Sequence, residues 1–124
     1  MPHKTAEARR AYHRRYMRDR RRADPEFREK ANDRRRKNDA RYREQGKAVI
    51  AEFRADGCQL CGEPEECCLS AHHIDPSEKE FTIGNMVRDK MSAAKIAQEL
   101  EKCICLCHNC HAKVHAGLIE LPAS

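Results

Sequence analysis

Apolar residues are sparse in the first third of the chain, where they recur at helical spacing. Within residues 5–23, Ala8, Tyr12 and Tyr16 lie four positions apart among many arginines, which predicts a helix. An Asp-Pro dipeptide then marks a break and a restart, because proline suits the first turn of a helix. A second helix is predicted over residues 25–45, where the pattern is almost entirely polar.

A stronger apolar stripe follows in residues 46–56. The stripe consists of Val49, Ile50 and Phe53, with Tyr42 one to two turns earlier. This spacing predicts the helix that docks onto the core of the protein. Gly57 is expected to end it, since glycine is common just past a helix end.

Short apolar runs in the second half predict a small sheet. Residues 67–72 and 103–106 have the length and composition of two short strands. Residues 77–90 between them are expected to form a loop, anchored by Phe81 and Ile83.

Two short helices complete the pattern. Ser92 is a suitable N-cap for a helix over residues 93–101. The buried face of that helix is predicted to carry Ile96 and Leu100. A final helix is expected over about 108–116 and should stop at Gly117.

Composition limits how such a chain can be stabilised. The 124 residues suit one domain with an appendage, but 36% are charged, 5% are aromatic and none is tryptophan. A hydrophobic core this small needs additional stabilisation by disulfides or a bound metal, and the eight cysteines can provide it. The Arg-rich N-terminus has no apolar run, and no stretch is suited to a membrane span. We therefore expect a cytoplasmic protein without membrane contact, in which cysteines bind metal rather than form disulfides.

Positive charge is concentrated at the N-terminal end. Residues 1–57 hold 19 Lys and Arg against 10 Asp and Glu, whereas residues 58–124 hold 6 against 10. The net charges of +9 and −4 predict a basic arm that binds DNA or RNA, unless it is a solvated and partly disordered helix. The expected contacts are Arg14, Arg15, Arg18, Arg20, Arg21, Arg22, Arg34, Arg35, Arg36, Lys102 and Lys113.

The cysteines form two Cys-x-x-Cys pairs. These are Cys58 with Cys61 and Cys107 with Cys110, a spacing typical of zinc sites. The other four are expected to be small buried residues on strands rather than ligands. They are Cys67, Cys68, Cys103 and Cys105.

Four histidines suggest a second site. An antiparallel sheet would bring His72 and His73 beside the last helix, on which His111 and His115 share one face. Imidazoles in this number can hold a metal with open positions for a substrate, or form a closed zinc site without catalysis. Both interpretations stay open at this point.

Together these motifs resemble the HNH endonucleases, also called His-Me finger or ββα-metal nucleases, and in particular HNH proteins common in phage genomes. The matching stretches cover about residues 58–117. They are Cys58-x-x-Cys61-Gly62, His72-His73-Ile74-Asp75-Pro76, Lys79-x-Phe81-x-Ile83, Glu99-Leu100-x-Lys102-Cys103, and Leu106-Cys107-x-Asn109-Cys110-His111-x-x-x-His115.

The resemblance implies a role for each motif. The two cysteine pairs would bind one structural Zn²⁺, and His73 would be the general base. His72, His111 and His115 would hold a catalytic divalent metal such as Mg²⁺, Mn²⁺ or Zn²⁺. The asparagine that orients the base in that family has no counterpart here, because Lys102 occupies its place.

The expected fold is therefore a small zinc-stabilised α+β protein. It would comprise a basic helical arm over residues 1–45 and a ββα-metal domain over residues 46–124. The expected function is metal-dependent hydrolysis of double-stranded DNA in a bacterial or phage-infected cell. The alternative is a zinc-stabilised nucleic-acid-binding module without catalysis. His73 separates the two, because a binding module does not need a histidine beside its metal.

Overall fold

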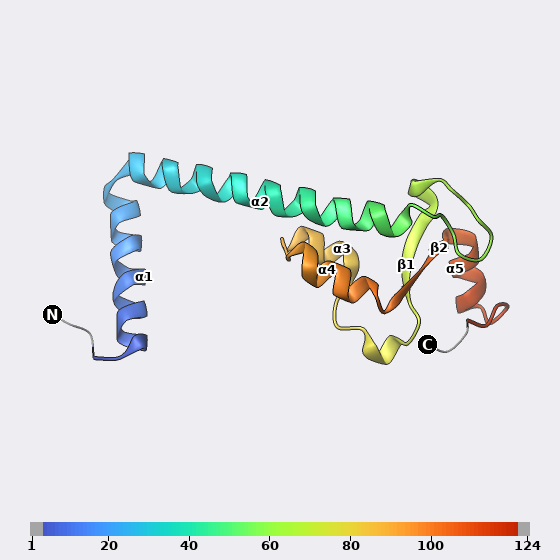
Figure 1. Cartoon of the computed structure of the whole chain (residues 1–124). Coiled ribbons are helices and arrows are strands. Elements are labelled where there is room, and N and C mark those ends of the chain that lie inside the picture. Colours follow the sequence, from blue (N-terminus) through green and yellow to red (C-terminus); the bar gives the residue numbers. More distant parts are fainter. Residues whose placement is uncertain (1–3, 122–124) are drawn as a thin grey trace. The chain divides into compact units, whose positions relative to one another are not determined.

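The computed structural model describes residues 4–121 of the chain, which form five α-helices and one two-stranded sheet (Figure 1). The helices are α1 (Ala6–Ala23), α2 (Pro25–Arg54), α3 (Ile83–Arg88), α4 (Ala93–Leu100) and α5 (His108–His115). The strands are β1 (Leu69–His73) and β2 (Cys103–Cys107), and Glu66–Cys68 and Pro76–Glu78 are short 3-10 turns. None of the helices within residues 4–121 is long and apolar enough to cross a membrane.

The chain divides into two compact units, Met1–Asn38 and Asp39–Ser124, and the division falls inside α2. In the first unit α1 buries none of its residues. The predicted break is confirmed: α2 restarts at Pro25, and the Asp24 carboxylate accepts a hydrogen bond from the Phe27 N–H at 3.1 Å. Because α2 runs without interruption to Arg54, the predicted domain boundary between residues 45 and 46 stays a prediction.

In the second unit the last turns of α2 pack against α3 and α4. Three residues of the predicted stripe contact a buried cluster of Met86, Ile96 and Leu100. These are Val49, Ile50 and Phe53. Gly46 allows α2 to approach α4 closely, since a Cβ atom at this position would lie only 2.9 Å from Ile96 Cδ1. Tyr42 was expected to extend this stripe, but its side chain is 37% exposed and lies outside the contact.

The loop expected over residues 77–90 is wrong in part, because it contains α3. Met86 on this helix is only 1% exposed, whereas the expected anchor Phe81 is 41% exposed. Ile83 does pack on the cluster. A helix of six residues is too short for its apolar period to be recognised in the sequence.

The two strands pair antiparallel, with His73 opposite Cys103 at one end and Leu69 opposite Cys107 at the other. The first strand starts two residues later than predicted, since Cys67 belongs to a 3-10 turn. The second strand, the Ser92-capped α4 and the final helix α5 agree with the predictions within one residue. Beyond the sheet, the Ile74 N–H donates to the Lys102 carbonyl at 3.1 Å.

A glycine turn connects α2 to the first cysteine pair. Gly57 has φ of +76°, a conformation that favours glycine, and a Cβ atom there would lie 2.6 Å from the Glu63 carbonyl oxygen. The Cys58 N–H donates to that same carbonyl at 2.9 Å. The turn thus delivers Cys58 directly from the end of α2 to the edge of the sheet.

Candidate metal centres

The four predicted zinc ligands come together. The sulfur atoms of Cys58, Cys61, Cys107 and Cys110 all lie within 4.8 Å of one another. Cys107 ends β2 and caps α5, so the sheet and helix position one pair, while the turn after Gly57 positions the other. The Cys61 and Cys107 sulfurs are 3.6 Å apart. Tetrahedral zinc with Zn–S bonds of ~2.3 Å places its sulfurs about 3.8 Å apart, so this donor set fits zinc.

The surroundings of these thiols favour the ionised, thiolate form of at least one of them, Cys58. Burial alone would raise the pKa of Cys58, but backbone N–H groups at Cys107, Cys61 and Leu60 lower it to about 6. Burial and the neighbouring thiols raise the pKa of Cys110 to about 12. Four thiolates this close repel one another, and a divalent cation removes that repulsion.

Of the other four cysteines, only Cys105 is a fully buried strand residue as predicted. Cys105 is buried, but Cys67 is exposed and lies before the strand, and Cys68 and Cys103 are half-buried. Cys103 donates from its sulfur to the Glu99 carbonyl at 3.5 Å. None of them belongs to the four-cysteine cluster, as expected.

Three of the four histidines form a second cluster. His72 projects from β1 towards α5, with its ring centroid 4.8 Å from that of His111 and 4.9 Å from that of His115. The Nε2 atoms of His111 and His115 are 2.9 Å apart. Three imidazoles that offer one nitrogen each within 4.8 Å can hold a metal ion.

Ser70 orients one of these rings, a residue that the sequence analysis did not select. Its hydroxyl donates to the Leu106 carbonyl at 3.3 Å and lies 3.3 Å from His111 Nδ1. Since the hydroxyl hydrogen is directed to the carbonyl, Nδ1 is the donor, which leaves His111 Nε2 with a lone pair. Outer hydrogen bonds of this kind fix the tautomer of metal-binding histidines. The signal in the sequence is that Ser70 precedes His72 by two residues, and so shares its face of the strand.

Burial and neighbouring histidines lower the pKa of two of these rings, which favours their neutral, metal-binding form. Burial, followed by the neighbouring His111 and His115, lowers the pKa of His72. Burial and the adjacent His115 also lower the pKa of His111. Both rings are therefore neutral at pH 7, the form that coordinates metal.

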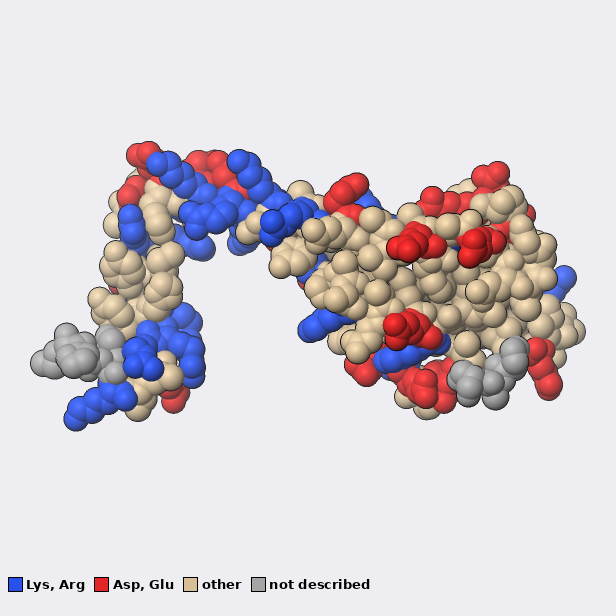
Figure 2. Space-filling view, viewed as in Figure 1, with Lys and Arg blue, Asp and Glu red and all other residues tan. Residues whose placement is uncertain are grey.

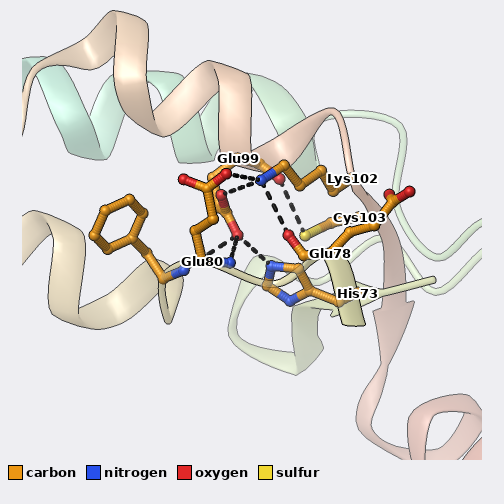
Figure 3. A network of polar contacts seen from close by, with 7 residues as sticks. His73, Glu78, Glu80, Glu99, Lys102 and Cys103 are labelled. Atoms are coloured by element: carbon orange, nitrogen blue, oxygen red, sulfur yellow. Dashed lines mark hydrogen bonds and ion pairs between the residues drawn. The ribbon is translucent and has the colours of Figure 1, made fainter. Parts of the chain in front are cut away.

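His73 does not join this cluster, contrary to the expected placement beside the last helix. Successive side chains of a strand point to opposite faces, so His73 faces away from His72. Its Nε2 atom lies 2.9 Å from Glu99 Oε1 on α4, and the two side chains are 9% and 3% exposed (Figure 3).

Glu99 is the centre of a buried polar network that the sequence analysis missed. Its carboxylate accepts hydrogen bonds from the N–H groups of Glu80 and Phe81 at 3.1 and 3.3 Å, and from Lys102 Nζ at 3.0 Å (Figure 3). Burial alone would raise the pKa of Glu99, but His73, Lys102 and the two N–H groups lower it to about 2. An ionised carboxylate only accepts, so His73 Nε2 carries the hydrogen.

The Lys102 ammonium donates hydrogen bonds only within this network among the described residues. Its ammonium also donates to the Glu78 carbonyl at 3.1 Å and to the Glu80 carboxylate at 3.2 Å. We therefore leave Lys102 out of the proposed nucleic-acid interface. The other expected basic contacts, including Lys113 on α5, are exposed. On the face shown in Figure 2, Lys and Arg side chains gather over α1 and the first turns of α2.

A cavity of about 240 Å³ borders the strand that carries the histidines. Both Ser70 and His73 line it. Ser70 also contacts His111, but none of the three clustered histidines lines the cavity.

No family model, curated protein or solved structure matches this chain. The resemblance to HNH endonucleases therefore stays a hypothesis that rests on the motifs and on the geometry described above.

We predict that each chain binds one Zn²⁺ ion at the four-cysteine cluster and needs it to fold. Replacing Cys110 with serine removes one buried ligand and should abolish both zinc binding and the folded state. Elemental analysis and circular dichroism measure the two effects. Cys67→Ser, at an exposed cysteine outside the cluster, should retain zinc and fold. A folded wild-type protein that is purified without chelator and contains no zinc would contradict this prediction.

We predict that Glu99→Ala lowers the free energy of unfolding by about 3–5 kcal/mol at pH 7, because it leaves buried donors without their carboxylate. Urea denaturation at fixed zinc concentration measures the change. Since the pKa of Glu99 is lowered from 4.5 to about 2, its contribution is complete above pH 4.5 and is lost as the pH falls towards 2.

Glu101→Ala is the matched control for this measurement, since Glu101 caps the same helix and is exposed. It should change the unfolding free energy by no more than about 0.5 kcal/mol. Equal effects of the two substitutions would show that the Glu99 network contributes nothing particular to stability.

Proposed function

We propose that the protein is a metal-dependent endonuclease of the HNH type that hydrolyses phosphodiester bonds of DNA. The observation that carries this proposal is the convergence of His72 from β1 with His111 and His115 from α5. These three imidazoles lie at a strand–helix junction next to the four-cysteine cluster.

Three protein ligands suit catalysis better than a closed structural site. Structural zinc sites have four protein ligands, whereas catalytic sites keep positions for substrate and water. His72, His111 and His115 would hold the ion, and when bound it would act as a Lewis acid on a phosphate oxygen. Ser70 keeps His111 in the tautomer that leaves Nε2 available.

His73 is the proposed general base. The Glu99 carboxylate accepts its Nε2–H, so that the neutral ring would have its lone pair on Nδ1. That nitrogen can take a proton from an attacking water. Glu99 thereby supplies the orienting contact for which the sequence has no asparagine. In this proposal a substrate phosphate would reach the base through the cavity that His73 and Ser70 line.

The basic first unit is proposed to contact the nucleic-acid backbone. Residues 1–38 hold 15 Lys and Arg against 6 Asp and Glu, a net charge of +9, and residues 39–124 have a net charge of −4. Phosphate contacts from such a unit provide affinity without sequence preference.

One observation favours the alternative of a nucleic-acid-binding module without catalysis. His73 is only 9% exposed, and its partner Glu99 also anchors the backbone of residues 80 and 81. In this alternative the His73–Glu99 pair is purely structural, and the three-histidine cluster is a second stabilising metal site.

We predict that His73→Ala abolishes plasmid nicking while zinc content and DNA binding persist. Loss of a general base typically lowers the rate by ~10²–10⁴. His72→Ala and His111→Ala should instead weaken the second metal site, so high Mg²⁺ or Mn²⁺ should partly restore their activity but not that of His73→Ala. Gel assays with and without EDTA measure the rates.

His108→Ala is the matched control, because His108 is an exposed histidine next to the second cluster that is not part of it. It should nick DNA at the wild-type rate. Near wild-type activity in His73→Ala would refute the assignment of the base. A wild-type protein that cuts neither DNA nor RNA at any metal concentration would favour the binding module.

For the basic arm we predict a change in the salt dependence of DNA binding. Replacing Arg14, Arg15 and Arg18 with glutamine should weaken binding and reduce the slope of log K against log salt by up to about 3. Fluorescence anisotropy with a labelled duplex at several salt concentrations gives the slope. A variant carrying Lys47→Gln, Arg88→Gln and Lys95→Gln loses the same charge from the second unit and should alter the slope much less. Equal slopes for both triple variants would argue against the arm.

A further inference from the structure

The cavity beside β1 has a lining that the proposed roles of Ser70 and His73 do not explain. Its floor is apolar and includes Ile50, Phe53 and Leu100. Two further side chains that line it are cationic, Arg54 from the end of α2 and Lys79 from the segment after β1. Among the described residues, no Asp or Glu lines this cavity.

Both cations have hydrogen-bonding capacity that the protein does not use. Arg54 Nε is buried and has no hydrogen-bond partner among residues 4–121. Arg54 Nη1 lies 3.9 Å from the exposed Glu66 carboxylate, at the outer limit of an ion pair. The Lys79 ammonium forms no hydrogen bond or ion pair with the described residues. A buried donor without a partner is costly, and an anion in the cavity would satisfy it.

We propose that this cavity is a phosphate subsite, in which Arg54 and Lys79 bind one phosphodiester group of a polynucleotide next to His73. Arginine suits this role because its planar guanidinium presents paired donors to phosphate oxygens, and lysine adds a mobile point charge. The apolar floor fits the sugar and base that a phosphodiester carries, and free inorganic phosphate has no such part.

This subsite deepens the proposed nuclease function and rests on it for its biological role. It adds a fixed anchor for the substrate, since Arg54 belongs to the helix that packs on the core through Ile50 and Phe53. The arm would attract DNA as a whole, whereas the cavity would determine which phosphate lies beside His73. Binding can be measured without cleavage, so the two proposals can fail separately.

The test is an NMR titration of the ¹⁵N-labelled full chain in its zinc-bound form, without added Mg²⁺ or Mn²⁺. The probes are the dinucleotide thymidylyl-thymidine, which has one phosphodiester, inorganic phosphate, and sodium chloride at matched ionic strength. We expect the dinucleotide to shift the amide signals of the cavity residues Ala71, Thr82 and Gly84 saturably. Arg54→Gln should weaken this binding at least about tenfold, because it removes a charged hydrogen-bond donor.

Arg88→Gln is the matched control, since Arg88 is exposed and lies outside the cavity. It should leave the dinucleotide affinity unchanged. If Arg54→Gln does not fold, two single variants at exposed lysines replace it and its control. Lys79→Gln should weaken binding of the dinucleotide, and Lys95→Gln should not.

If shifts are seen, three results would still overturn the subsite. They are shifts reproduced by sodium chloride, binding of inorganic phosphate but not of the dinucleotide, and equal losses in the cavity variants and their controls. A wild-type chain that binds the dinucleotide in the cavity but cuts no DNA would refute the nuclease and leave the subsite standing. A chain that cuts DNA but gives no shifts at these amides would refute the subsite alone.

Discussion

The four-sulfur cluster is the constraint on which the second unit depends. One of the two buried clusters consists largely of cysteines, with Leu69 and Leu106 as its aliphatic members. Three of these cysteines, Cys58, Cys107 and Cys110, are also candidate ligands that must ionise to bind metal. A core of thiols packs like a small apolar core, but a core of thiolates requires a cation. A zinc ion at this cluster would fix the junction of β2 and α5, and with it the positions of His111 and His115.

The sequence was a good guide where chemistry follows from local spacing. The histidines four residues apart on α5 had to share a face, and a short antiparallel hairpin was sufficient to bring His72 to them. The N-cap at Ser92 and the start of α2 at Pro25 were equally local signals. The six residues of α3 were missed because so short a helix shows no period. The arm remains defined by its charge alone, since α1 buries no residue.

The spacing of residues along the sequence could not predict contacts between side chains that are far apart in the chain. His73 and Glu99 are 26 positions apart, and nothing in the local pattern joins them. Strand alternation does predict that adjacent histidines diverge, so the placement of His73 away from the cluster was available in principle. Its partner was not, because Glu99 lies 26 positions further along the chain, on α4. Lys102 was expected to contact nucleic acid, and its ion pair with the buried Glu99 carboxylate was not foreseen.

The divergence of His72 and His73 has a mechanistic consequence for the proposed reaction. A histidine on the same face as the metal ligands would compete to become a ligand itself, and its lone pair would then be unable to accept a proton. The opposite face removes His73 from that competition, and the Glu99 carboxylate fixes its tautomer by hydrogen bonding to Nε2. A base and a metal on two faces of one strand can act on the same phosphate only at the border of that strand. Ser70 contacts His111 from the face that carries His72 and also lines the cavity of His73.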